Sequence, residues 1–95
     1  MVIRILDVTA GADTQEQGIA LYGILADLLK TTDVVSVSFD GVDIATSSFV
    51  NAAFVPLLTN MSFSEVKRRI RIVRASRQTI DLIKRRLTRE ATVAA

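Results

Sequence analysis

The stretch from residue 33 to residue 49 reads DVVSVSFDGVDIATSSF and contains the clearest local signals of the chain. Apolar residues alternate with small or polar ones over residues 33–39, which is the period of two typical of a β-strand. Asp40-Gly41 is a turn pair, and the hydroxyl residues at positions 46–48 precede an apolar run. We therefore predict a strand over residues 33–39 and a helix that begins near residue 46.

A strand and a helix are predicted before this stretch. Residues 2–8 are rich in β-branched side chains and predict a strand. Asp13 or Thr14 is a suitable helix N-cap, and Gln17 follows Thr14 at the spacing of a capping box. We expect the helix to extend to about Lys30. Its apolar residues recur at spacings of three and four and form one stripe: Ile19, Leu21, Ile24, Leu25, Leu28 and Leu29.

Three residues disfavour the predicted helices. Gly18 and Gly23 each cost a helix up to ~1 kcal/mol relative to alanine, so at least one of them should allow close approach to another element, such as a strand. The second helix, over about residues 49–61, is apolar around most of its circumference, as are helices that are buried or contact a partner. Pro56 has no amide hydrogen and predicts a kink or an early end there.

A third strand and a third helix are predicted after a polar connection at residues 60–66. Charged and apolar residues alternate toward residues 69–73, and the outward positions of this strand are basic. That pattern indicates one solvated side or a location at the edge of the sheet. Ser76 is a suitable cap for the last helix. The order β-α-β-α-β-α predicts a small α/β domain, with a parallel or mixed sheet and packed helices.

Composition excludes several classes of chemistry. The chain has 95 residues, of which 49% are hydrophobic and 23% charged, and this length fits one domain with one core. It contains no cysteine and no histidine, so it lacks disulfides, thiolate metal ligands and the usual general base. No phosphate-binding loop and no Gly-x-Gly-x-x-Gly motif occurs. We therefore expect neither an enzyme nor a bound cofactor.

The N-terminal residues show no basic region followed by an apolar segment and a small-residue cleavage site. Charged and amide residues interrupt the apolar stretches before they reach the roughly 20 residues that a membrane span requires. We therefore expect a cytoplasmic protein.

The main candidate site is the segment from residue 38 to residue 49, where a strand end and a turn precede a helix start. A phosphoryl group on Ser47 or Ser48 would add a charge of about −1.5 to −2 at this position, with little refolding. The alternative is that one of the hydroxyl groups only caps the helix. Asp40 and Asp43 lie in the turn, where we favour turn and capping roles over a cation site.

These residues carry a resemblance to the STAS superfamily, the sulfate-transporter and anti-sigma-factor-antagonist domain, and especially to its STAS-like bacterial branch of unknown function. The similar segments are the strand at 35–39, the turn at 40–42, the helix start at 44–49 and the upstream helix start at 14–18. In anti-sigma-factor antagonists an aspartate is followed by two hydroxyl residues and a glycine, and the serine directly after the aspartate is phosphorylated by a partner kinase. Ser47 matches that serine by order.

The sequence departs from the antagonist pattern in two places. Thr46 stands in place of the aspartate and Phe49 in place of the glycine. Both departures are typical of the STAS-like branch. The resemblance covers most of the chain and implies that residues 1–95 form a single STAS-like domain.

The resemblance also implies a function, namely bacterial signalling and transcription regulation through protein–protein interaction. The partner would be a kinase-like anti-sigma factor or another signalling domain. The phosphorylation candidates are Ser47 and Ser48. The predicted partner-binding residues are Asp40, Asp43, Thr46, Ser47, Ser48 and Phe49.

Two alternatives use other parts of the chain. Basic residues between positions 67 and 89 are a candidate nucleic-acid surface, but no aromatic residues are interleaved for base stacking, and acidic residues lie among them. A solvated basic face is the preferred interpretation of this segment. The apolar helix over residues 49–61 is a candidate surface for a homodimer.

Overall fold

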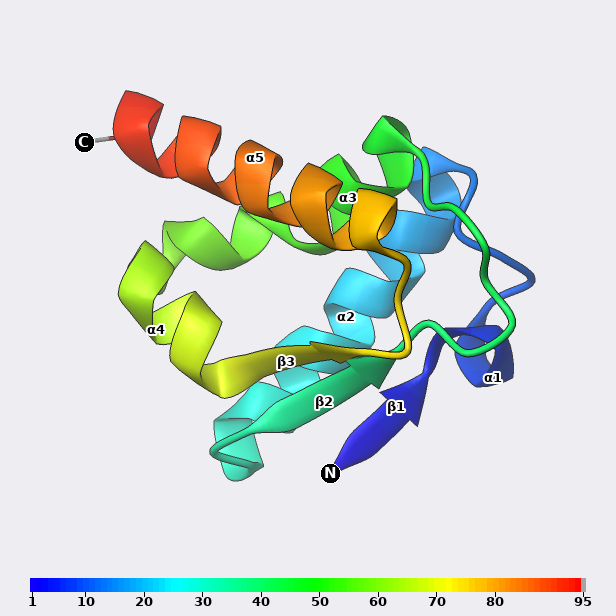
Figure 1. Ribbon diagram of the computed structural model, residues 1–95. Helices are drawn as coiled ribbons and strands as arrows, with labels where there is room; N and C mark the ends of the chain where they lie inside the picture. The colour runs from blue at the N-terminus through cyan, green and yellow to red at the C-terminus, as the bar shows by residue number, and fades with distance from the viewer. Residues whose placement is uncertain (95) are drawn as a thin grey trace.

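Three parallel strands form one sheet in the computed structural model, which describes residues 1–94 (Figure 1). Strand β2 (Val35–Ser38) lies between β1 (Val2–Arg4) and β3 (Ile70–Val73), so β1 and β3 are the edge strands of the sheet. In this register Val37 pairs with Ile3 on one side and with Ile72 on the other. The predicted α/β class and the parallel sheet are confirmed.

Helices connect and cover the strands, and their bounds among the described residues are α1 (Ile5–Val8), α2 (Gln15–Thr31), α3 (Ser47–Ala53), α4 (Phe63–Arg69) and α5 (Arg77–Ala94). A 3₁₀ turn, η1 (Val55–Thr59), follows α3 and holds Pro56 in its first turn, so the predicted early helix end is confirmed. None of the described helices has the length and hydrophobicity needed to cross a membrane.

Two predicted boundaries are wrong. The strand predicted over residues 2–8 ends at Arg4, because the chain turns into α1 and buries Ile5 completely. The connection predicted at residues 60–66 contains the start of α4, whose N-cap is Ser62. The Ser62 hydroxyl accepts a hydrogen bond of 3.1 Å from the Glu65 amide, which satisfies a donor that is otherwise unpaired in the first helical turn.

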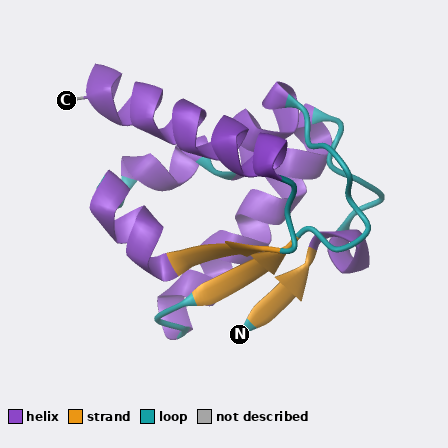
Figure 2. Cartoon of the chain, in the orientation of Figure 1, coloured by secondary structure: helices purple, strands orange, loops and turns teal. Residues whose placement is uncertain are grey.

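The two faces of the sheet differ in burial. Ile3, Val35, Val37 and Ile70 are buried and share the face that packs against the helices. In Figure 2 the helices gather above and behind the strands. On the opposite face Val2 is 67% exposed, and Arg71, which pairs with Ser36, is also exposed. The predicted solvated side of the third strand is therefore confirmed.

Helix α3 runs through the centre of the core. Phe49, Val50, Ala53 and Phe54 are completely buried, which explains why this segment is apolar around most of its circumference. The rings of Phe54 and Phe39 stack with their centroids 6.5 Å apart, a favourable aromatic separation. The core of this one chain, rather than a partner, covers these side chains of α3.

A glycine allows α3 to approach α2. A Cβ atom at Gly18 would lie 2.5 Å from the carbonyl oxygen of Phe49 and 2.7 Å from the Cβ of Ala52. The predicted packing reason is thus confirmed for Gly18, although the neighbour is a helix and not a strand. A Cβ at Gly23 would meet no atom within 4 Å. Of these two glycines, Gly18 is the one whose missing side chain lets α2 and α3 pack closely.

The C-terminal end of α2 is held by one side chain. The Arg69 guanidinium donates hydrogen bonds to the carbonyl oxygens of Leu29 at 2.7 Å, Thr32 at 3.1 Å and Asp33 at 3.0 Å. Its side chain is only 19% exposed. These bonds satisfy carbonyl groups that have no partner within the helix. Arg69, which the sequence placed in a basic surface, is therefore a structural residue.

Candidate functional site: the start of helix α3

Thr46 is the N-cap of α3. Its hydroxyl accepts a hydrogen bond of 3.2 Å from the Phe49 amide and donates one of 2.8 Å to the carbonyl oxygen of Asp13. The Thr46 amide also donates to the carbonyl oxygen of Ala12 at 3.0 Å. The capping interpretation of the hydroxyl cluster is thus confirmed for Thr46. The cap does not need Ser47 or Ser48, whose hydroxyl groups can serve another purpose.

Ser47 lies at a groove between α3 and α5. The groove measures about 370 Å³ and is lined by Ser47, Leu82, Arg85, Arg86 and Arg89. Among the described residues, none of the three arginines forms an ion pair with an acidic side chain. We call this feature the Ser47 groove. One of the two candidate serines thus shares a groove with three arginines of α5.

Ser48 lies on a different groove. It is exposed and lines a surface depression of about 470 Å³ together with residues of α2, α3 and η1: Gln15, Ile19, Tyr22, Asn51, Ala52 and Pro56. None of these residues is charged at neutral pH. The two serines are adjacent in sequence but line different grooves, and of these two grooves the one at Ser47 is lined by basic residues.

The Ser47 groove has the donors that a phosphate ester requires. Arginine presents a rigid fork of N–H groups that matches phosphate oxygens, and such charge-assisted bonds are about twice as strong as neutral ones. A phosphoryl group on Ser47 would lie in a groove that three arginines line. The same group on Ser48 would face amide, hydroxyl and apolar side chains, so the site favours Ser47 as the position for a dianion.

The two predicted aspartates lie in the turn before the site. The Arg4 side chain donates hydrogen bonds of 3.1 Å to Asp7 and 3.3 Å to Asp40, and the bond to Asp7, more than that to Asp40, raises the pKa of the Arg4 guanidinium. This ion pair ties Asp40 to the end of β1. Asp43 is exposed. In the described residues no three acidic side chains converge in a way that could hold a metal ion.

The turn itself has the predicted form. Gly41 has a φ of 84°, a conformation that favours glycine, and the Val42 amide donates to the carbonyl oxygen of Phe39 at 2.8 Å. The chain then passes through Asp43 and Ile44 to the cap at Thr46. Asp43 and Ile44 are thereby carried on the surface next to the two serines.

One predicted partner-binding residue is wrong. Phe49 is completely buried and belongs to the hydrophobic core. A fully buried ring has no surface to offer a partner. The sequence signal for this burial is the apolar run that begins at Phe49, directly after the hydroxyl cluster.

Two exposed isoleucines were missed as site residues. Ile44 is 60% exposed and Ile19 is 54% exposed. The helical periodicity assigned Ile19 to the buried stripe of α2, which is wrong, whereas Leu21 and Leu25 of that stripe are completely buried. The available signal for Ile44 was its position in a turn rather than on a regular helix or strand face. We define the α3-start surface as Ile19, Asp43, Ile44, Ser47 and Ser48.

The basic residues of the third strand and last helix have separate roles. Arg69 holds α2, and Arg68 lies 3.5 Å from the Asp33 carboxylate. Arg71 lies on the open face of the sheet. Arg85, Arg86 and Arg89 line the Ser47 groove. Residues 67–89 are thus divided among several local environments.

One comparison with known families gave a match. A family model described as a STAS-like domain of unknown function matches residues 17–79, which is about two thirds of the chain. The matched segment begins in the first turn of α2, includes all of α3 and ends in the first turn of α5. No curated protein and no solved structure matches the chain.

Proposed function

Because the chain belongs to the family of STAS-like domains of unknown function, we propose that it is a non-enzymatic regulatory module whose α3-start surface binds a signalling protein. The observation that carries this proposal is the position of Ser47. Its neighbour Thr46 makes the helix cap, and three arginines of α5 line the groove beside it. The resemblance to anti-sigma-factor antagonists supports the same serine.

The proposed switch is phosphorylation of Ser47 by a partner kinase, such as a kinase-like anti-sigma factor. The Ser47 hydroxyl oxygen would attack the γ-phosphorus of ATP, ADP would leave, and the hydroxyl proton would pass to a base of the kinase. The product carries a charge of about −1.5 to −2. This charge would offset most of the positive charge of Arg85, Arg86 and Arg89, so the partner would meet a different electrostatic surface without refolding of the domain.

The exposed isoleucines support docking at this place. Ile19 lines the same depression as Ser48, Ile44 precedes Ser47 by three residues in the chain, and each isoleucine leaves more than half of its surface accessible. Apolar anchors surrounded by polar groups are typical of protein interfaces. A partner that covers Ile44 would also contact Ser47 or Ser48, which makes its affinity sensitive to a phosphate there.

The alternative, binding of nucleic acid through residues 67–89, gains no support from the geometry. Arg69 is committed to the carbonyl groups of α2, and Arg68 is paired with Asp33. A phosphate-binding surface needs several accessible cations along one path. Arg71 lies on the open face of the sheet and Arg85, Arg86 and Arg89 line the Ser47 groove, so these cations lie on different surfaces.

Photocrosslinking in the native cell tests the docking proposal. A photoreactive amino acid at position 44 is expected to give an adduct of one discrete mass with a protein partner. The matched control is the same amino acid at Val2, which is similarly exposed but lies on the open face of the sheet. Equal labelling from both positions, or no protein adduct from position 44, would contradict the proposal.

A second variant tests the switch. Ser47→Glu is expected to weaken the adduct from position 44 by roughly tenfold, because it changes the charge at the interface. Ser64→Glu is the control, since Ser64 is an exposed serine on α4. An adduct that is unchanged by Ser47→Glu, or equally reduced by both substitutions, would rule out a switching role for Ser47.

A further inference from the structure

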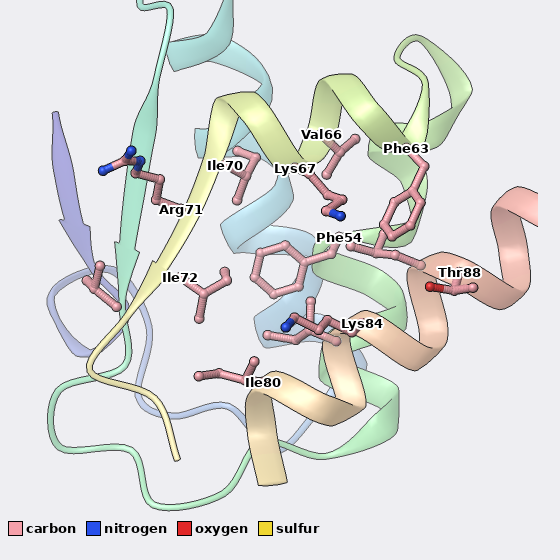
Figure 3. A pocket seen from close by; sticks show the side chains of 13 residues that line it. Phe54, Phe63, Val66, Lys67, Ile70, Arg71, Ile72, Ile80, Lys84 and Thr88 are labelled. Carbon is pink, nitrogen blue, oxygen red and sulfur yellow. The ribbon is translucent and has the colours of Figure 1, made fainter. Parts of the chain in front are cut away.

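A second surface of the molecule has no part in the function proposed above. It is a groove of about 640 Å³ between α5 and the adjoining α4 and β3, which we call the β3 groove (Figure 3). Its apolar walls include Phe54, Phe63, Ile70, Ile72, Ile80 and Ile83. Phe63, Ile72 and Ile80 are only partly buried. These three side chains leave apolar surface accessible along this side.

The groove runs beside an open sheet edge. Strand β3 pairs with β2 on one side only, and the Phe39 amide donates to the carbonyl oxygen of Val73 across that pairing. Successive residues of a strand direct their peptide groups to alternate sides. The N–H and C=O of Ile72, one residue before Val73, thus point away from β2. They are placed to pair with a further extended chain.

A chain that pairs there would place side chains in the groove. Ile72 directs its side chain to the same face as Val37, its partner in the register, and lines the groove. Side chains of a paired strand lie on the same two faces as those of its neighbour. Every second side chain of the added segment would therefore point toward Phe63 and Ile80. These contacts select small or medium apolar residues in alternation.

The charges around the groove determine which residues are favoured at the two ends of a bound segment. Lys67 and Lys84 line the groove. In the described part of the chain neither of these two cations is paired with a carboxylate, and no acidic side chain lines the groove. The Lys67 ammonium lies 5.5 Å from the centroid of the Phe63 ring, at the rim of the apolar wall. The rim is thus positive.

The same charges disfavour a second copy of this chain. Two β3 edges that paired with each other would bring Lys67 and Lys84 of both copies together, and like charges at an interface oppose binding. Basic residues at sheet edges protect natural proteins against such pairing. An acidic partner instead gains from them.

We propose that the β3 groove binds an extended segment of another protein, with alternating apolar residues that pair along β3 and acidic residues at its ends. The acidic ends would lie near Lys67 and Lys84. This surface is separate from the α3-start surface, so either proposal can fail without the other.

Synthetic peptides test this inference. One short peptide alternates valine with threonine and has glutamates at both ends, and a second has lysines in place of the glutamates. With the full chain the glutamate peptide is expected to bind roughly tenfold more tightly, since rim charges steer and select partners. Its binding is expected to shift the NMR signal of the Ile72 amide.

Charge reversal provides the decisive comparison. Lys67→Glu combined with Lys84→Glu is expected to invert the preference between the two peptides. Arg77→Glu is the matched control, because it makes the same charge change per residue at an exposed position of α5 outside the groove. Lys84→Glu alone, which is expected to reduce the preference, keeps the test valid if the double variant does not fold.

Several results would overturn the proposal. They are equal binding of both peptides, no response of the Ile72 amide, and an effect of Arg77→Glu as large as that of the rim variants. Displacement of the glutamate peptide by a second copy of the chain, seen as a dimer by light scattering, would assign the groove to self-association instead. Saturation of the groove by decanoate, with no peptide binding, would assign it to a fatty acid.

Discussion

Replacing Gly18 by alanine is expected to lower the free energy of unfolding by about 2 kcal/mol. An added methyl group would meet the Phe49 carbonyl oxygen at 2.5 Å and the Ala52 methyl at 2.7 Å, so α2 and α3 would have to move apart. Overpacking of this kind costs about 1–3 kcal/mol, and the contact with backbone favours the upper end. The higher helix propensity of alanine returns up to about 1 kcal/mol.

Gly23→Ala is the matched control for this prediction. It lies on the same helix, where an added methyl group meets nothing within 4 Å, so only the propensity gain applies. We expect it to stabilise the domain by about 0.5–1 kcal/mol. Urea unfolding of the two variants measures both effects. Equal stability changes of the same sign would contradict the assigned contact between α2 and α3.

Replacing Arg69 by methionine is expected to cost about 2–3 kcal/mol of stability. The substitution keeps an unbranched apolar stem but removes the donors to the carbonyl groups of Leu29, Thr32 and Asp33. Buried polar groups that lose their partner cost about 1–3 kcal/mol each, less where water reaches them. The last turn of α2 is expected to fray, which hydrogen exchange of its amides would detect.

Arg68→Met tests whether the loss of one positive charge is enough to explain the lower stability expected for Arg69→Met. Arg68 is the preceding residue, its side chain is 60% exposed, and it faces Asp33 at 3.5 Å. Exposed ion pairs contribute about 0–1 kcal/mol, so the expected loss is under about 1 kcal/mol. If Arg68→Met destabilises the domain as much as Arg69→Met, the capping role assigned to Arg69 is wrong.

The sequence predicted the elements whose signals are local. The alternation over residues 33–39, the Asp40-Gly41 turn and the capping box at Thr14 each depend on a few neighbouring residues. The structure contains all three features, and the Thr14 hydroxyl accepts from the Gln17 amide at 3.1 Å. These signals were sufficient for the fold class.

The short helices could not be predicted in the same way. Helix α1 spans only Ile5–Val8, so its apolar residues cannot repeat at helical spacing. Its β-branched residues are typical of a strand. Helix α4 did carry a sequence signal, because Ser62 and Glu65 have the spacing of a capping box. The segment around Ser62 mixes polar residues with single apolar ones, and this pattern favoured a loop over a helix.

The candidate site was predicted in position but not in composition. A helix does begin at the hydroxyl cluster of residues 46–48. The hydroxyl that caps it belongs to Thr46, which also donates a hydrogen bond to the carbonyl oxygen of Asp13, a residue distant in the sequence. Phe49 is buried in a core that several elements build together, and Gly18 of α2 packs against its backbone carbonyl group. The arginines beside Ser47 come from α5, so tertiary packing alone brings them to the serine.

A ³¹P NMR titration of the domain with phosphoserine at position 47 tests most directly whether α5 arginines recognise a phosphate there. The comparison protein has phosphoserine at position 48, and a third has phosphoserine at 47 with glutamine at positions 85, 86 and 89. Nearby cations favour the dianion, so phosphoserine 47 should have a lower second pKa than phosphoserine 48, and the glutamine variant should abolish that difference. Identical titration curves for all three proteins would show that Ser47 lies at no such site.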